Sequence, residues 1–332
     1  MAFTAFRGMG AVSQFFMALF VILVSVILTM IVATLAAIPL FGFDLLLSAL
    51  TQADLDNPQN IEVLKYLQVV QSIGMFVLPP FIIGALYTGD FAGYLSMRRP
   101  INWPLLMIGI LALLVVTPCI SVIGYLNSQM SLPDWMSGLE EWMRNMEDQA
   151  DVVIQKFIEV KTTGGLLFNL FMIAVIPALG EEFLFRGVIQ QIFTKMTRNY
   201  HWGIWISAFL FSALHMQFFG FVPRMLLGAM FGYFLVYSGS IWIPVAAHFV
   251  NNAVGVLTLY SATSGESELE KVMDPDFSAG ISYYWPIALV SMAATLWLVY
   301  RMKKMRVDAV PAGLAEEPDF YYPVSDIDES KK

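Results

Sequence analysis

The stretch GLLFNLFMIAVIPALGEEFLFRGVIQ, Gly165–Gln190, decides the fold because it is apolar enough to cross a membrane and yet carries charged residues. A membrane-spanning helix needs about 20 predominantly apolar residues. Two adjacent glutamates, Glu181 and Glu182, and an arginine, Arg186, lie near the end of this stretch. Because charged side chains are costly inside a bilayer, they indicate either a buried structural ion pair or a functional site.

The whole chain has the composition of a polytopic membrane protein. Of its 332 residues, 58% are hydrophobic and 13% are charged, and the mean hydropathy is +0.68. Soluble domains carry about 25% charged residues. The net charge is −8, and no basic cluster indicates nucleic-acid binding. We therefore expect an all-α protein embedded in the lipid bilayer, with no nucleic-acid partner.

About eight segments are long and apolar enough to be predicted as transmembrane helices. They are Gln14–Phe41, Leu67–Thr88, Trp103–Leu126, Gly165–Gln190, Trp202–Phe218, Phe221–Tyr237, Ile241–Tyr260 and Ile281–Tyr300. The connection Asn127–Thr163 is predicted to hold an additional amphipathic extracytoplasmic helix, because apolar residues recur there at helical spacing. These apolar residues are Trp135, Leu139, Trp142, Met143 and Met146. Such a helix either packs across the ends of the spans or forms a lid over a cavity.

The charges between the spans predict the orientation of the chain, because cytoplasmic loops collect Lys and Arg. The loops Asp44–Glu62 and Ser264–Phe277 are acidic, whereas basic residues occur at alternate ends of the spans. We expect an integral membrane protein of the bacterial cytoplasmic (inner) membrane, with both termini in the cytoplasm. The basic residues are Arg7, Arg98, Arg99, Lys195, Arg198, Arg301, Lys303, Lys304 and Arg306.

Two of the three histidines and one asparagine lie inside other predicted spans. His215 occurs in FSALH, and His248 and Asn252 occur in HFVNN, where they are four residues apart and share a helix face. At 1.5 Å of rise per residue, Glu181 and His215 lie about 20 Å from the cytoplasmic edge, and His248 and Asn252 about 10–16 Å. Because these depths are similar, we expect the four residues, with Glu182 and Arg186, to face a common cavity.

This set of side chains suits hydrolysis by an activated water molecule. A carboxylate in an apolar site is a usable general base, and a histidine can assist it or bind a metal. A His–Asn pair supplies N–H donors for a developing oxyanion. Two histidines with one glutamate also suit Zn²⁺, so Glu181, His215 and His248 are candidate ligands. The residues leave the metal-free and the zinc route open.

The same residues resemble the motifs of the CPBP family, which comprises CAAX prenyl endopeptidases and bacteriocin-processing or Abi-type membrane proteases. The stretch EEFLFR, Glu181–Arg186, is similar to the family's EExxxR motif. FSALH and HFVNN resemble its FxxxH and HxxxN motifs, in the family's order and on separate predicted spans. The matched region runs from about Gly165 to Tyr260.

The resemblance implies an intramembrane endopeptidase. It implies that Glu181 activates water together with His215, and that His248 and Asn252 bind the oxyanion. Glu182 and Arg186 then orient the site as a pair. Members of the family have been described both as glutamate peptidases and as metalloproteases, so a zinc cofactor stays open. The implied partner is a peptide or protein substrate at the membrane.

Two other functions fit intramembrane charges and stay as alternatives. A proton-coupled transporter also uses buried Glu, His and Arg, although we find no inverted repeat of the kind such folds contain. A catalytically idle scaffold or immunity-type protein would keep the residues without turnover. The chain is expected to divide into an N-terminal transmembrane region with about three helices and the outer amphipathic segment (1–163), a catalytic core (164–260), an outer loop with the last transmembrane helix (261–306), and a disordered cytoplasmic tail (307–332).

Overall fold

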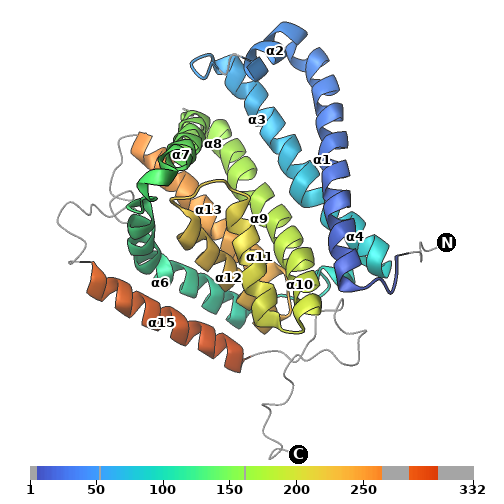
Figure 1. Ribbon diagram of the computed structural model, residues 1–332, viewed down its shortest axis with the longest axis vertical. Helices are drawn as coiled ribbons and strands as arrows, with labels where there is room; N and C mark the ends of the chain where they lie inside the picture. The colour runs from blue at the N-terminus through green and yellow to red at the C-terminus, as the bar shows by residue number, and fades with distance from the viewer. Residues whose placement is uncertain (1–5, 52–53, 161, 264–283, 306–332) are drawn as a thin grey trace, which may run out of the picture.

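The computed structural model describes residues 6–51, 54–160, 162–263 and 284–305. These residues form helices joined by short turns, and no strand occurs among them. Figure 1 shows the arrangement. The predicted acidic loop Ser264–Phe277 and the predicted disordered tail 307–332 lie outside the described residues.

In the described part of the chain, seven helices are long and apolar enough to cross a membrane. This confirms the prediction of a polytopic all-α membrane protein. The seven are Ala11–Phe41 (α1), Pro58–Thr88 (α3, η1 and α4), Trp103–Ser128 (α6), Thr163–Thr197 (α8 to α10), Phe221–Ser238 (α12), Trp242–Ala262 within α13 (Trp242–Thr263) and Trp285–Lys304 (α15).

The prediction of a full span over Trp202–Phe218 is wrong. Helix α11 is Tyr200–Ala213 and has 14 residues, which corresponds to about 21 Å of rise and is too short for the hydrocarbon core. Its end is followed by a turn in which Met216 has a positive φ of 54°. The chain then enters α12, so His215 lies in this turn and not inside a helix.

The outer surface of the helices is apolar, as expected of a protein solvated by lipid. Phe16, Val32 and Leu296 expose 64%, 65% and 63% of their surface, respectively. Large contiguous patches of this kind are rare on soluble monomers. Because lipid tails solvate such side chains, the polar backbone is satisfied inside each helix and the polar side chains collect within the bundle.

The core packs in two groups of helices around the stretch that carries the glutamates. One cluster of buried side chains joins α6, α11, α12, α13 and α15, and a second joins α1, α4, α11 and the Glu182–Ile189 segment. In Figure 1, α9 and α11 to α13 lie at the centre, with α6 and α15 on one side and α1, α3 and α4 on the other. The short helices α2 (Phe43–Thr51) and α5 (Phe91–Tyr94) connect the N-terminal spans.

The amphipathic helix predicted in the connection Asn127–Thr163 is confirmed as α7, Ser137–Ile158. Trp135 precedes it in a short 3-10 turn, η2 (Asp134–Met136), and is 82% exposed. Figure 1 shows α7 crossing the bundle near the beginning of α8 and the end of α13. Helix α7 contacts α3, α8 and α13, so it covers one end of the central helices.

Wide π-helical turns precede prolines in two of the spans. Segment η1 (Ile73–Val77) comes before Pro79 and Pro80, and η3 (Leu170–Val175) comes before Pro177. Proline has no N–H and its ring clashes with the preceding turn, so a widened turn accommodates it within a continuous helix. Gly180 lies against η1, since a Cβ there would be 2.8 Å from the Cβ of Phe76.

Candidate active site

The two glutamates lie where the helical geometry changes. Helix α9, Ile176–Glu181, ends at the first glutamate, and a π-helical segment η4, Glu182–Ile189, begins at the second. The span then continues as α10, Gln190–Thr197. π-Helical turns inside α-helices are frequent at functional sites. Glu181 and Glu182 are both buried, with 7% and 0% of their surface exposed.

Glu182 is compensated by a buried arginine on the next turn. Arg186 Nη1 lies 2.9 Å from Glu182 Oε1, and Nη2 donates to the carbonyl of Gly228 over 2.8 Å. The guanidinium also lies over the rings of Phe211 and Phe231, at 4.6 and 5.6 Å from their centroids. The pairing predicted from the four-residue spacing is therefore present, and it is closed off from solvent.

His248 bridges the two glutamates. Its Nδ1 lies 2.7 Å from Glu182 Oε1, and its Nε2 lies 3.8 Å from Glu181 Oε2. A carboxylate only accepts hydrogen bonds, so Nδ1 carries a proton and Nε2 is the nitrogen that faces Glu181. The ring stacks on Phe231, with centroids 5.3 Å apart. Glu182 thus fixes both the orientation of this histidine and the nitrogen that it presents to Glu181.

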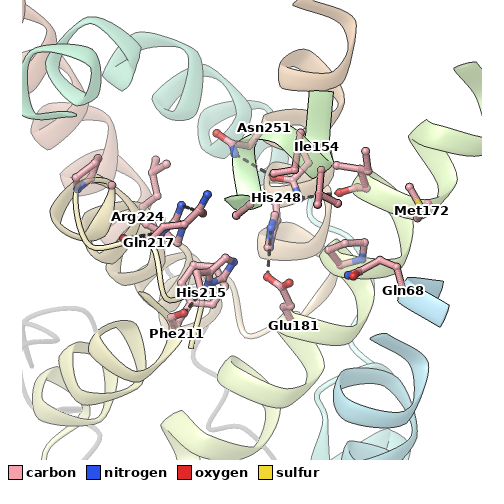
Figure 2. A pocket seen from close by; sticks show the side chains of 18 of the residues that line it. Gln68, Ile154, Met172, Glu181, Phe211, His215, Gln217, Arg224, His248 and Asn251 are labelled. Atoms are coloured by element: carbon pink, nitrogen blue, oxygen red, sulfur yellow. Dashed lines mark hydrogen bonds and ion pairs between the residues drawn. The ribbon is translucent and has the colours of Figure 1, made fainter. Parts of the chain in front are cut away.

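A cavity of about 830 Å³ contains one face of this cluster. Glu181, His215, His248 and Asn252 line it, whereas Glu182 and Arg186 do not. The expectation that all six residues face the cavity is therefore wrong for this buried pair. The reason is geometric, because adjacent residues of a helix point in directions about 100° apart. Figure 2 shows Glu181 and His215 on facing sides of the cavity, with His248 above Glu181.

His215 and Asn252 are each held by a backbone carbonyl. His215 Nδ1 lies 2.8 Å from the carbonyl oxygen of Phe211, so Nδ1 donates and Nε2 is left as the second ring nitrogen. Asn252 Nδ2 donates to the carbonyl of Ile173 over 3.1 Å. The side-chain oxygen of Asn252 accepts a hydrogen bond from Asn251 over 3.1 Å. These contacts hold a polar wall made by α13 and the turn after α11.

The side chains as placed do not form a metal site. Among the described residues, no group of three His, Cys, Asp or Glu side chains could hold a metal ion. His248 Nδ1 is engaged by Glu182 and His215 Nδ1 by Phe211, so Nε2 is the ring nitrogen that each histidine could offer to a metal. We therefore derive no step through a metal.

Several cavity residues were not predicted from the sequence, among them an arginine and a glutamine beside His215. Arg224, in the first turn of α12, and Gln217, in the turn after α11, line the cavity beside His215. Gln217 accepts a hydrogen bond from Arg224 Nη2 over 2.6 Å. The available signal was an arginine inside the predicted span Phe221–Tyr237, since intramembrane charges indicate functional sites.

Comparisons with known proteins match the part of the chain that builds this site. Residues 163–254 match the family of type II CAAX prenyl endopeptidase Rce1-like proteins. The uncharacterized protein YpbD of Bacillus subtilis (strain 168) is 28% identical over 90 residues, covering 26% of this chain and 43% of the relative. An uncharacterized 24.3 kDa protein of Escherichia coli is 27% identical over 115 residues, covering 32% and 52%. No solved structure matches.

The fold and the site define a polytopic all-α membrane protein with a buried cluster of carboxylates and histidines beside a cavity. Residues 163–254 are similar to the Rce1-like type II CAAX prenyl endopeptidases, in agreement with the resemblance of the motifs to the CPBP family. The chain spans about half the length of the curated relatives that it matches.

Proposed function

We propose that this protein is an intramembrane endopeptidase that hydrolyses a peptide bond of a membrane-associated peptide or protein. The observation that carries the proposal is the cavity, which collects Glu181, His215, His248 and Asn252 from three separate stretches of the chain. The similarity of residues 163–254 to the Rce1-like family supports a membrane protease at the level of the family.

In the proposed mechanism, Glu181 is the general base. Its carboxylate accepts a proton from water as the water oxygen attacks the scissile carbonyl carbon, and the Nε2 lone pair of His215 helps to orient that water. The C–N bond then breaks as Glu181 returns the proton to the leaving amine. Glu182 and Arg186 take no part in proton transfer and orient His248.

Asn252 and His248 are proposed to stabilise the oxyanion. Asn252 Nδ2 has two hydrogens, of which one is directed to Ile173, so the other is available. Donation from His248 Nε2 requires the doubly protonated ring, because Nδ1 already donates to Glu182. Removing an oxyanion donor typically costs about 10²–10³ in kcat.

Comparison of protein N-termini in three strains tests the function. The strains express the wild type, Glu181→Gln, and the control Glu62→Gln, which changes an exposed glutamate. We expect a set of N-termini of membrane-associated proteins to be absent only from Glu181→Gln cells. Identical sets in all three strains would contradict the assignment, and proton-coupled flux in proteoliposomes that depends on Glu181 would favour a transporter instead.

The zinc route predicted from the sequence is tested separately. It predicts stoichiometric Zn²⁺ in the purified protein, held by Glu181, His215 and His248, and loss of the metal in the His215→Ala, His248→Ala double variant. The metal-free mechanism instead predicts that a membrane-permeant chelator leaves peptide cleavage unchanged. If the chelator stops cleavage and added Zn²⁺ restores it, the zinc route is favoured. Glu181 would then be a metal ligand and not the general base.

We also propose that the protein lies in the bacterial cytoplasmic membrane with both termini in the cytoplasm. The last turn of α15 carries three basic residues, Arg301, Lys303 and Lys304. The basic residue Arg99 lies at the end of α12, because Ser240, which follows that helix, donates a hydrogen bond to the carbonyl of Arg99. In Figure 1, the ends of α10 and α15 lie on the same side of the bundle. Fusions to a cytoplasm-active reporter should be bright at both termini.

A further inference from the structure

The cavity contains a second charged group that the proposed mechanism does not use. Arg224 is partly buried in the wall formed by α12. Its side chain donates two hydrogen bonds, and both go to Gln217. Nη2 donates to Gln217 Oε1 over 2.6 Å, and Nη1 donates to the Gln217 carbonyl over 3.5 Å. Unlike Arg186, it forms no ion pair with a carboxylate in the described part of the chain.

Three carboxylates, Glu147, Asp151 and Glu181, interact electrostatically with Arg224 but form no close ion pair with it among the described residues. Glu147 of α7 accepts a hydrogen bond from the backbone N–H of Phe219 over 2.9 Å. A Cβ built on Gly220 would lie 3.4 Å from Arg224 Nη2 and 3.7 Å from Glu147 Oε1, so both charged groups lie beside this glycine. Burial raises the pKa of Asp151, and the charge of Asp148 adds to this effect, whereas the charge of Arg224 opposes it.

The guanidinium of Arg224 has N–H donors that Gln217 does not use. A guanidinium carries five N–H donors in a planar fork that matches a carboxylate, and Gln217 accepts from only two of its nitrogens. A partly desolvated charge inside a membrane protein is costly unless it is paired, so such residues mark substrate contacts. Figure 2 shows Arg224 and Gln217 on the wall beside His215, with Glu181 on the other side of the cavity.

We propose that Arg224 binds a carboxylate of the peptide substrate and so selects peptides with an acidic group close to the scissile bond. This inference rests on the proposed function. A peptide that presents its scissile carbonyl to Glu181, His248 and Asn252 runs past His215 toward Arg224, which places the carboxylate within a few residues of the cleaved bond. The carboxylate is either an Asp or Glu side chain or the free carboxyl end of the chain.

Binding measurements test the selectivity without requiring turnover. Fluorescent peptides that differ at one position as Glu, Gln or Lys, and end in a free acid or an amide, are titrated against Glu181→Gln protein in lipid nanodiscs. We expect the acidic peptide to bind about 10- to 100-fold more tightly than its neutral partner, as for a hydrogen bond between charged groups. Adding Arg224→Gln should remove the preference for the acidic peptide, and Arg224→Lys should retain part of it. Arg224→Glu should instead bind the peptide that carries Lys most tightly.

A control variant and the peptide ends separate the possible explanations. Arg144→Gln removes an arginine of α7 that is paired with Glu140 and should leave the ratio unchanged. A preference for acid over amide ends identifies the chain terminus as the source, and a preference for internal Glu identifies a side chain. If Arg224 only holds the turn at Gln217, its variants will weaken the binding of acidic and neutral peptides equally, and this result would overturn the proposal. Absence of hydrolysis by the wild type, with the binding ratio intact, would instead count against the proposed function alone.

Discussion

The two sides of the Glu181–Glu182 turn differ in how their charged side chains are paired. Behind the cavity, Glu182 is paired with Arg186 at 2.9 Å, and both side chains are almost completely buried. On the cavity side, Glu181 lies 3.8 Å from His248 Nε2, and Arg224 donates its hydrogen bonds to Gln217, with no closer ion pair at either group among the described residues. The charged groups of the closed side are paired with each other, whereas those of the cavity side face the cavity, where the proposed substrate would bind.

His248 connects these two sides. Its Nδ1 belongs to the closed cluster and its Nε2 to the cavity, so in the proposed mechanism the buried pair acts by orienting one ring. A histidine oriented by a buried carboxylate is a recurring arrangement in hydrolases. The comparison therefore predicts that changes behind the cavity reduce stability first, whereas changes inside it reduce turnover first.

Removal of Arg186 should have the largest effect on stability. Arg186→Met removes the cationic partner of the buried Glu182 and leaves it the hydrogen bond from His248, and breaking a buried pair in this way costs about 3–5 kcal/mol. Unfolding in detergent, followed by circular dichroism, measures this loss, and the double variant Glu182→Gln, Arg186→Met should recover part of it. The exposed pair Arg144–Glu140 has the same four-residue spacing, and Arg144→Met should cost under about 1 kcal/mol. Equal losses at the two pairs would remove the distinction between the closed and the open side.

Removal of Asn252 should reduce turnover more than stability. Asn252→Ala deletes an N–H donor that Ile173 holds in place, so kcat should fall by about 10²–10³ while the unfolding transition shifts little. Asn251→Ala is the matched control, because this amide also lines the cavity but donates to Asn252. Single-turnover cleavage of a peptide identified from the N-terminal comparison measures both variants. A similar loss for Asn251→Ala would argue against a specific oxyanion role.

Much of the site follows from spacing and depth in the sequence. The four-residue spacing correctly predicted the Glu182–Arg186 pair, and the similar depth of Glu181, His215 and His248 predicted a shared cavity. These signals are readable because helices have a fixed rise and a fixed angular period.

Other features could not be predicted because they depend on local irregularities. Helix α11 ends at Ala213, although no proline or glycine follows until Gly220, so the sequence gives no stop signal. The contact between Glu182 and His248 depends on how η4 begins and how α12 and α13 pack, and neither has a sequence period. Arg224 was accessible to the same argument that identified Glu181, because both are ionisable residues in predicted spans.

Close packing behind the closed side offers a milder test of the comparison. A Cβ on Gly228 would lie 3.1 Å from Phe211 Cδ1 and 3.2 Å from Arg186 Nη2, so these groups must shift. Gly228→Ala should therefore cost about 1–3 kcal/mol of unfolding free energy, as for other overpacked sites. Gly255→Ala on α13 is the control, since nothing lies within 4 Å of its added carbon, and it should be neutral or stabilising. If Gly228→Ala proves neutral, the packing around Arg186 is looser than the structure shows.

The smallest expected effect is at α7, which lies over the cavity and outside the spans. The backbone N–H of Leu132 and the guanidinium of Arg144 donate to Glu140, and these hydrogen bonds lower the pKa of its carboxyl. A folded-state pKa below the unfolded value stabilises the connection above the unfolded pKa, and this stabilisation is lost as the pH falls through the folded-state pKa. Hydrogen exchange at Leu132, corrected for the intrinsic rate, should therefore lose protection only in acid. In Glu140→Gln the protection should already be low at neutral pH and independent of pH. Acid loss that persists in Glu140→Gln would show that another group anchors this end of α7.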